Sequence, residues 1–213
     1  MHPETVTVTA GRPGKDPGEP LNAPIVMASA FVAGGETEYG RFANPAFAPL
    51  EAAIGALEGG TALAFASGLA AGAAVLDLAP AGTTIVLPRH GYNGSTDLAR
   101  SGPWELRLID PSDTAGSIEA FDGAALVWLE SPTNPAMEIG DLSVLVPAAK
   151  AAGALVAVDN TFRTPLREKP LDHGADVVVH SASKLLAGHS DLILGATVTR
   201  DEDLQAALKT HRT

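Results

Sequence analysis

The sequence predicts a three-layer α/β/α domain built around a mostly parallel sheet. From Thr61 onward, short apolar runs alternate with alanine-rich segments of helical periodicity, which is typical of parallel strands joined by crossover helices. Several of the apolar runs contain almost no polar residue, as expected for strands that helices cover on both faces. A hydrophobic content of 46% over 213 residues is sufficient for a substantial core.

The apolar runs and the periodic segments alternate in order along the chain. In the first helical segment, Leu50, Ile54 and Leu57 recur at helical spacing and are expected to face the core. The predicted strands are residues 62–66, 84–87, 105–109, 125–129, 155–158 and 177–179. The predicted helices are residues 49–57, 69–78, 93–100, 142–152 and 201–209.

The first part of the chain has a different character. Residues 1–46 contain proline and glycine at short intervals with little periodicity, which predicts an extended N-terminal arm. Residues 47–213 are expected to form one large domain. Nothing after the last predicted helix is long enough for a second domain.

Composition disfavours several classes of function. The net charge of −11 disfavours binding to nucleic acid or to anionic membranes. The absence of cysteine excludes disulfides, thiolate metal sites and a thiol nucleophile. The first residues lack the basic start and apolar run of a secretory signal, so a cytoplasmic protein is expected.

Two further features suggest a membrane or a metal but are better explained otherwise. The uncharged run between Glu58 and Asp77 is rich in Gly and Ala, so it favours a buried strand, a turn and a packed helix over a membrane span. His180 and His189 have no third ligand at metal spacing, so we expect hydrogen-bonded neighbours of the site and no metal.

Polar clusters follow several of the predicted strands. In a parallel α/β sheet, ligands bind at the carboxyl ends of the strands. The clusters at these ends are Ser67-Gly68, ESPTNP (130–135), DNTF (159–162) and HSASK (180–184).

Asp159 and Lys184 each follow an apolar strand and suit one ligand. Pyridoxal phosphate has an aldehyde that condenses with a lysine and a ring nitrogen that a carboxylate keeps protonated. The alternative for these two residues alone is a buried Asp–Lys ion pair with a structural role, because such pairs also perturb ionisable groups.

The turn at Ser67-Gly68 offers an anchor for a phosphate. Backbone N–H groups at the start of the following helix bind anions, and glycine permits close approach. Ser181 and Ser183, on either side of Ala182, are candidates for two further hydrogen bonds. Ser-Gly before a helix is also ordinary capping chemistry.

Taken together, the motifs resemble one enzyme family. In order along the chain they are EYGRFANP (38–45), AFASGLAA (64–71), ESPTNP (130–135), DNTF with Pro165 (159–165) and HSASKLLAGHSD (180–191). This set is similar to the Cys/Met-metabolism family of pyridoxal-phosphate enzymes, which includes cystathionine γ-synthase, cystathionine γ-lyase, methionine γ-lyase and the homoserine sulfhydrylases. The resemblance implies the large domain of fold type I, the aspartate aminotransferase-like fold.

The resemblance also implies roles around the cofactor ring. Lys184 matches the lysine that holds the cofactor as a Schiff base and then shuttles protons, and Asp159 matches the carboxylate that pairs with the ring nitrogen. Tyr92 matches the tyrosine that stacks on the ring and assists proton transfer, although a core aromatic would explain it too. Asn134 resembles the residue near the phenolic oxygen, although Thr-Asn-Pro also makes a plain turn.

The implied phosphate contacts come from two subunits. Gly68 and Leu69 would offer backbone N–H groups after Ser67, and Ser181 and Ser183 would add hydroxyls. Tyr39 and Arg41 match a pair that reaches the phosphate of a neighbouring subunit, so a homodimer or homotetramer is implied. The alternative for Arg41 is a solvated charge on the arm.

By this resemblance the reaction is elimination or replacement at the γ-carbon of a sulfur amino acid. Glu38 resembles an acidic residue that meets the distal ammonium of cystathionine, which favours a cystathionine γ-lyase or γ-synthase, although a solvated glutamate explains it equally well. The alternatives are a methionine γ-lyase or O-acyl-homoserine sulfhydrylase, and a non-catalytic pyridoxal-phosphate-binding fragment or subunit. A Rossmann-type dehydrogenase is disfavoured, because no G-x-G-x-x-G opens the first strand–helix unit.

Members of the family continue into a smaller C-terminal domain, which supplies an arginine for the substrate carboxylate. We expect this chain to lack that domain, and we prefer a fragment of a longer protein as the explanation. A chain that works with a partner and a degenerate protein are the alternatives.

Overall fold

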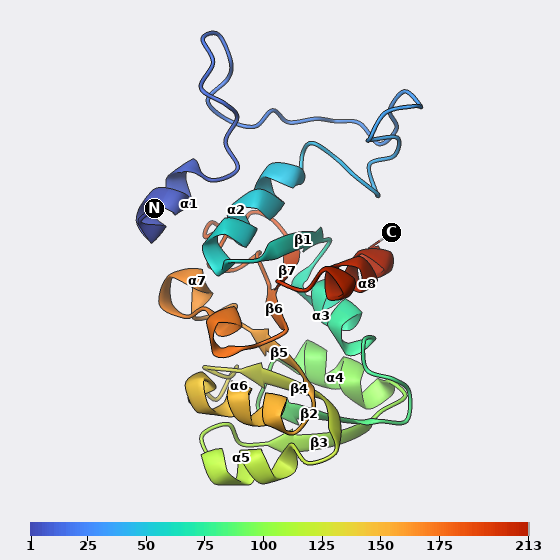
Figure 1. Cartoon of the computed structure of the whole chain (residues 1–213), viewed down its shortest axis with the longest axis vertical. Coiled ribbons are helices and arrows are strands. Elements are labelled where there is room, and N and C mark those ends of the chain that lie inside the picture. The colour runs from blue at the N-terminus through green and yellow to red at the C-terminus, as the bar shows by residue number, and fades with distance from the viewer. Residues whose placement is uncertain (213) are drawn as a thin grey trace.

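The computed structural model describes residues 1–212, in which seven strands form one sheet between two layers of helices (Figure 1). The strands are β1 (Thr61–Phe65), β2 (Thr84–Pro88), β3 (Glu105–Ile109), β4 (Ala124–Glu130), β5 (Leu155–Asp159), β6 (Val177–His180) and β7 (Gly195–Thr199). The order across the sheet is β1-β7-β6-β5-β4-β2-β3. Only β7 runs antiparallel to its neighbours, β1 and β6, so the sheet is mixed but mostly parallel.

The helices divide between the two faces of this sheet. They are α1 (Pro3–Thr9), α2 (Ala48–Glu58), α3 (Gly68–Leu76), α4 (Asn93–Ser101), α5 (Thr114–Ala120), α6 (Leu142–Ala151), α7 (Thr164–Arg167) and α8 (Glu202–Arg212), with a 3-10 turn, η1, at Pro170–His173. Figure 1 shows α3, α4 and α8 on one side of the sheet and α2, α5 and α6 on the other. The predicted three-layer arrangement is therefore present.

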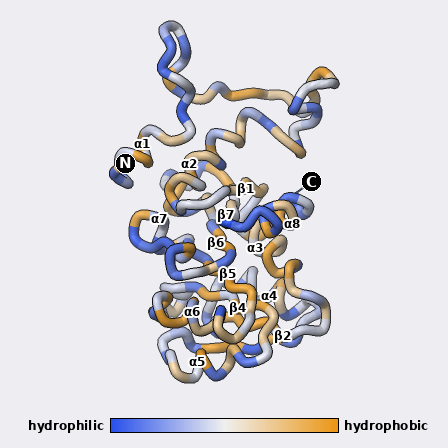
Figure 2. Tube along the Cα trace, in the orientation of Figure 1, coloured by the Kyte–Doolittle hydropathy of each residue, from blue (hydrophilic) through white to orange (hydrophobic). Residues whose placement is uncertain are grey.

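Alternation along each strand divides the core into layers. On β4, Leu126 and Trp128 pack with α3 and α4, whereas Val127 and Leu129 pack with α6. A smaller cluster lies between α2 and the sheet, where Ile54 of α2 packs with Val198 of β7. Because all these strand residues are buried, the sequence reads as continuous apolar runs, as in Figure 2.

The structure corrects the sequence prediction at several elements. All six predicted strands and five predicted helices are present, with ends that differ by a few residues. The prediction missed β7, because an apolar run that starts near a site loop and contains Gly195 has no clear strand signal. It also missed α1, α5, α7 and η1, which are short and bury few residues.

The N-terminal segment lies apart from the sheet. After α1, which contacts α2, residues 10–47 form no helix or strand, and one isolated bridge joins Ala30 to Tyr39. Figure 1 shows this segment looping away from the layered body. Within residues 1–212, no helix has the length and apolar content needed to cross a membrane.

Two glycines allow three backbone segments to meet at one edge of the sheet. A β-carbon on Gly195 at the start of β7 would lie 2.0 Å from the carbonyl oxygen of Ser67. A β-carbon on Gly68 would lie 2.7 Å from Cβ of Ser181. Since real Cβ atoms do not approach so closely, only glycine permits the turn between β1 and α3 to pack against the ends of β6 and β7.

Replacing Gly195 by alanine should therefore destabilise the fold. The added methyl meets backbone atoms that cannot rotate away, so we expect G195A to lower the free energy of unfolding by about 1–3 kcal/mol or more. Gly35→Ala is the matched control, because an added Cβ there meets nothing within 4 Å. Urea unfolding of the two variants tests this, and equal midpoints for both would contradict the close packing.

Candidate active site

Three neighbouring strands deliver polar side chains to one edge of the sheet. Glu130 ends β4 and Asp159 ends β5, and their Cα atoms are register partners. His180 ends β6, directly before the loop that carries Lys184. This is the carboxyl edge at which parallel α/β sheets bind ligands.

Asp159 is held in place by the residues that follow it. Its Oδ1 accepts the backbone N–H of Thr161 at 2.9 Å, and Thr161 Oγ1 accepts the backbone N–H of Ser181 at 2.8 Å. Burial raises the pKa of Asp159, against the opposing effects of the Thr161 hydrogen bonds and His180. No ion pair joins Asp159 to a cationic side chain within residues 1–212, so its buried carboxyl has no cationic partner that would favour its ionised form.

A second carboxyl lies beside it. Glu130 is buried, and its Oε2 accepts the backbone N–H of Tyr92 at 2.8 Å. Burial, followed by the charge of Asp159, raises the pKa of Glu130 to about 8, although hydrogen bonds from the backbones of Tyr92 and Asn134 oppose this. Two neighbouring carboxyls that interact electrostatically disfavour each other's ionisation, so a cation placed between them would be stabilised.

The turn before α3 is a candidate anion-binding cradle. Ser67 caps the helix, and its Oγ accepts the backbone N–H of Ala70 at 3.0 Å. The N–H groups of Gly68 and Leu69 precede the first hydrogen bonds of the helix, so they are free to bind an anion. The close approach at Gly68 brings the hydroxyl of Ser181 to the same place.

Lys184 lies in the loop between β6 and β7. Its backbone N–H donates to Ser181 O at 3.1 Å, while its side chain is exposed. No ion pair joins it to Asp159 in the part of the chain that the structure describes. The structural Asp–Lys pair considered from the sequence is therefore not formed, and the amine is available to react.

The other predicted contacts vary in their surroundings. Tyr92 precedes α4 with its side chain 44% exposed, so it is no core aromatic. Asn134 is half-buried in the loop after β4. The hydroxyl of Ser183 donates to Leu194 O at 3.1 Å and accepts the Leu194 N–H at 2.8 Å, so it is already engaged within the loop.

The arm residues are not brought to this edge. Arg41 stacks over the ring of Tyr39 at 5.1 Å, and Glu38 Oε1 accepts the backbone N–H of Gly34 at 3.0 Å. These contacts remain within the arm. Their predicted roles, which involve a neighbouring subunit and a substrate, stay predictions.

Sequence reasoning missed the polar groups that support the site. Glu130 and Thr161 lie within quoted motifs, but only the structure shows their contacts. Behind the sheet, Glu58 Oε1 accepts from His180 Nε2 at 2.6 Å and from Asn160 Nδ2 at 2.8 Å. All three residues are fully or almost fully buried. This hydrogen-bonded cluster agrees with the expectation for His180, and no local sequence signal identifies Glu58 as its partner.

The remaining cavities and acidic groups do not offer an equivalent site. A cavity of about 660 Å³ lies between the arm, α2, β1 and α8, but none of the candidate residues lines it. Its Arg212 is paired with Glu51 and lies over the ring of Phe47. Within residues 1–212, no group of three His, Asp or Glu residues is arranged to hold a metal ion.

Comparison with known proteins agrees with this geometry. The family model for the Cys/Met metabolism PLP-dependent enzymes matches residues 4–213. Cystathionine gamma-lyase of Bacillus subtilis is 38% identical over 96% of this chain and 57% of its own length. Cystathionine gamma-synthase of Mycobacterium bovis is 38% identical over 95% of this chain and 55% of its own.

Solved structures share the whole fold. Cystathionine gamma synthase of Xanthomonas oryzae pv. oryzae, in complex with cystathionine, is 36% identical with a TM-score of 0.91, covering 100% of this chain and 58% of that one. This confirms the predicted resemblance and the aspartate aminotransferase-like fold class. The chain spans little more than half the length of the relatives it matches.

The stability of the chain without added cofactor should fall as the pH rises from 4.5 to about 8. The folded state keeps a proton on Glu130 that the unfolded state has released, so the unfolded state binds fewer protons across this window. We expect a loss on the order of a few kcal/mol.

Thermal or urea unfolding across this pH range measures the effect. Glu130→Gln cannot ionise, so its stability should vary much less with pH than that of the wild type. Parallel curves for the two proteins would contradict the assignment of the proton to this carboxyl pair.

Proposed function

This chain belongs to the Cys/Met metabolism PLP-dependent enzyme family, and on that premise we propose that it is the cofactor-binding part of a cystathionine γ-lyase or γ-synthase. The observation that supports this best is the composition of the carboxyl edge. An uncompensated carboxyl at Asp159, an unpaired amine at Lys184 and the cradle at Gly68 lie on segments that are joined by direct contacts.

The residues present fit pyridoxal phosphate. A protonated ring nitrogen is the cation that Asp159 and Glu130 lack among the described side chains. A phosphate suits the N–H groups of Gly68 and Leu69 and the hydroxyl of Ser181. When bound, pyridoxal phosphate supplies an aldehyde that reacts with an amine and a ring that withdraws electrons from the substrate's α-carbon.

The chain's own residues would then bind, orient and move protons. We assign Lys184 as the amine that attaches the cofactor and afterwards moves a proton at the substrate's α-carbon. Tyr92 would stack on the ring and assist that transfer. Asp159 would hold the proton on the ring nitrogen, and Asn134 would lie near the phenolic oxygen. Ser183 remains a candidate phosphate ligand, although its hydroxyl would have to leave Leu194.

The proposed reaction is elimination or replacement at the γ-carbon of an amino acid. Cystathionine is the preferred substrate, because Glu38 lies on the arm that carries Tyr39 and Arg41 and would face the distal ammonium. A methionine γ-lyase or O-acyl-homoserine sulfhydrylase is the alternative within the family.

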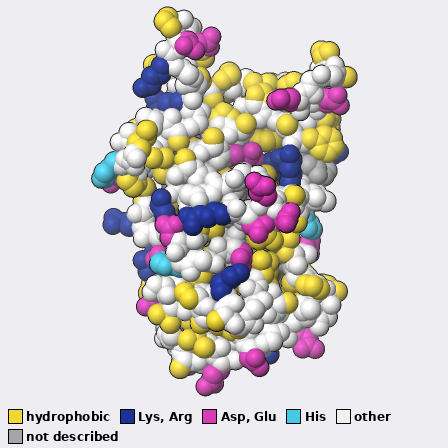
Figure 3. Space-filling view, in the orientation of Figure 1, with side chains coloured by type: hydrophobic (Ala, Val, Ile, Leu, Met, Phe, Trp, Pro, Cys, Tyr) yellow, Lys and Arg dark blue, Asp and Glu magenta, His cyan; other side chains and the backbone are white. Residues whose placement is uncertain are grey.

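We further propose that the active protein is a homodimer or homotetramer. Arg41 stacks over the rings of Tyr39 and Phe42 on the arm, and large apolar side chains of the arm are exposed, including Met27 and Val32 at 93% each. Figure 3 shows apolar side chains along this arm. A neighbouring subunit would cover them and receive Tyr39 and Arg41 at its phosphate site.

The division into an arm at residues 1–46 and a large domain at residues 47–213 is part of the same proposal. The chain spans 57% and 55% of the length of the two relatives named above. A cytoplasmic location is proposed from the acidic, cysteine-free composition.

Reduction with borohydride should attach pyridoxal phosphate to one lysine. We expect the purified chain with the cofactor to show a visible absorption band, and mass spectrometry to locate the reduced adduct on Lys184. Lys184→Ala should lose both the band and the adduct, whereas Lys15→Ala, on the exposed arm, should keep them. An adduct that persists in the Lys184 variant would overturn the assignment.

Thiol release should identify the substrate class. With cystathionine, a γ-lyase releases a free thiol more than tenfold faster than with methionine, because Glu38 gains its ionic partner only from cystathionine, a preference worth about 1.4 kcal/mol. Colorimetric thiol detection measures this with wild type and with Glu38→Gln. Equal rates of thiol release from methionine and cystathionine would support a methionine γ-lyase. An adduct on Lys184 without turnover of any family substrate supports the non-catalytic fragment.

A further inference from the structure

Glu130 links two loops that carry predicted cofactor contacts. Its carboxyl accepts the backbone N–H of Tyr92 at 2.8 Å, and the backbone N–H of Asn134 acts on the same carboxyl to lower its pKa. A β-carbon on Gly91 would lie 3.0 Å from Glu130 Oε2, so the chain before Tyr92 packs directly on the carboxyl. With 6% of its surface exposed, Glu130 fixes both loops from inside the protein.

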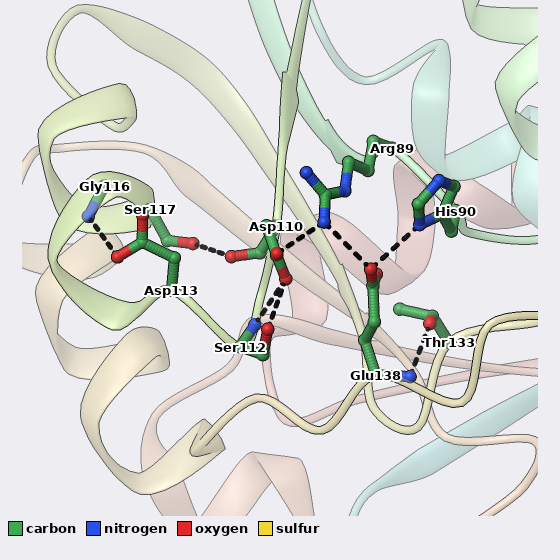
Figure 4. Close-up of polar contacts among 9 residues, drawn as sticks. All are labelled: Arg89, His90, Asp110, Ser112, Asp113, Gly116, Ser117, Thr133 and Glu138. Carbon is green, nitrogen blue, oxygen red and sulfur yellow. Dashed lines mark hydrogen bonds and ion pairs between the residues drawn. The ribbon is translucent and has the colours of Figure 1, made fainter.

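Ion pairs at the protein surface also join these two loops. Figure 4 shows Arg89 and His90, which precede Tyr92, both directed at Glu138 in the loop that carries Asn134. Arg89 Nη2 lies 3.2 Å from Glu138 Oε1 and 2.6 Å from Asp110 Oδ2, and His90 Nδ1 lies 2.8 Å from Glu138 Oε1. Arg89 and His90 are half-exposed, so water weakens these ion pairs.

Glu130 and Glu138, which both join the two loops, differ in their relation to Asp159. Glu130 and Asp159 are register partners on adjacent parallel strands and interact electrostatically. The charge of Glu138 is instead balanced by Arg89, with His90 hydrogen-bonded to the same oxygen. Among the described residues, Glu130 is therefore a buried carboxyl without a cationic side chain beside it, and a positive ring nitrogen next to it would favour its ionised form. Glu138 already has a cationic partner.

We propose that Glu130 is a positioning residue of the cofactor site. It holds the backbones of Tyr92 and Asn134 in place and sets a second carboxyl beside the one that meets the ring nitrogen. This inference rests on the proposed function, because it assigns Glu130 a task in binding the same cofactor.

The two parts of this task are separable by substitution. A glutamine at position 130 keeps an oxygen that accepts a backbone N–H but removes the charge, whereas alanine removes both. Loss of the hydrogen bonds leaves buried N–H groups unsatisfied and frees the two loops. Loss of the charge alone removes electrostatic support for a positive ring nitrogen.

The test compares Glu130→Ala, Glu130→Gln and Glu138→Gln, each loaded with pyridoxal phosphate. We expect E130A to bind the cofactor about tenfold more weakly, consistent with one or two lost hydrogen bonds, and E130Q to recover most of that affinity. Hydrogen exchange at the Tyr92 amide should be faster in E130A and near wild type in E130Q.

The charge is tested by the pH dependence of the visible band of the bound cofactor. We expect its midpoint to move by about one unit to lower pH in both Glu130 variants, because a nearby anion that favoured the protonated form is lost. Glu138→Gln should leave the midpoint unchanged, because its effect is confined to loop tethering.

Each outcome has a distinct meaning. Wild-type affinity and an unshifted midpoint in E130A, or in E130Q if the alanine variant does not fold, would overturn the role of Glu130. An equal shift in Glu138→Gln would overturn it too, because general loosening of the loops would then explain the effect. If the wild type forms no adduct on Lys184, the proposed function fails, whereas Tyr92 exchange still reports whether Glu130 holds that loop.

Discussion

The close packing of chain segments at Gly68 and Gly195 is the constraint on which the site depends. Without side chains at these two positions, the turn that begins α3 lies against the start of β7 and against Ser181 after β6. This contact sets the anion cradle beside the loop of Lys184. At Gly195 the neighbouring atoms are all backbone, so no side chain there could rotate to make room for a larger residue.

The rest of the site follows from where parallel strands end. In-register pairing of β4 with β5 places Glu130 next to Asp159, and Thr161 links Asp159 to Ser181. The carboxyls of Glu130 and Asp159 therefore lie at the same edge of the sheet as the α3 turn, and Lys184 lies on the loop after β6. The interaction of these two carboxyls is unfavourable for stability, and in the proposed function a bound cation would relieve it. On the opposite face, the buried contact of Glu58 with His180 fixes the end of β6.

Much of this was predictable from the sequence, and the exceptions have physical causes. Apolar runs identified the buried strands because both faces of the sheet are covered, but β7 begins with Gly195, whose role is a close approach rather than strand propensity. The helix α5 buries a single residue, so its sequence has little apolar periodicity. The motifs predicted Asp159, Lys184 and Gly68 as site residues, whereas the contacts of Glu130 and Glu58 are with partners 38 and 122 residues away. Such pairings arise only when the chain folds.

A crystal structure of the chain with pyridoxal phosphate bound would test the central claim most directly. The account predicts density that is continuous with Lys184 Nζ, a phosphate on the N–H groups of Gly68 and Leu69 and on the Ser181 hydroxyl, and a ring nitrogen facing Asp159. A cofactor bound elsewhere, for example in the cavity beside Phe47 and Arg212, or a phosphate placed away from the α3 turn, would contradict it.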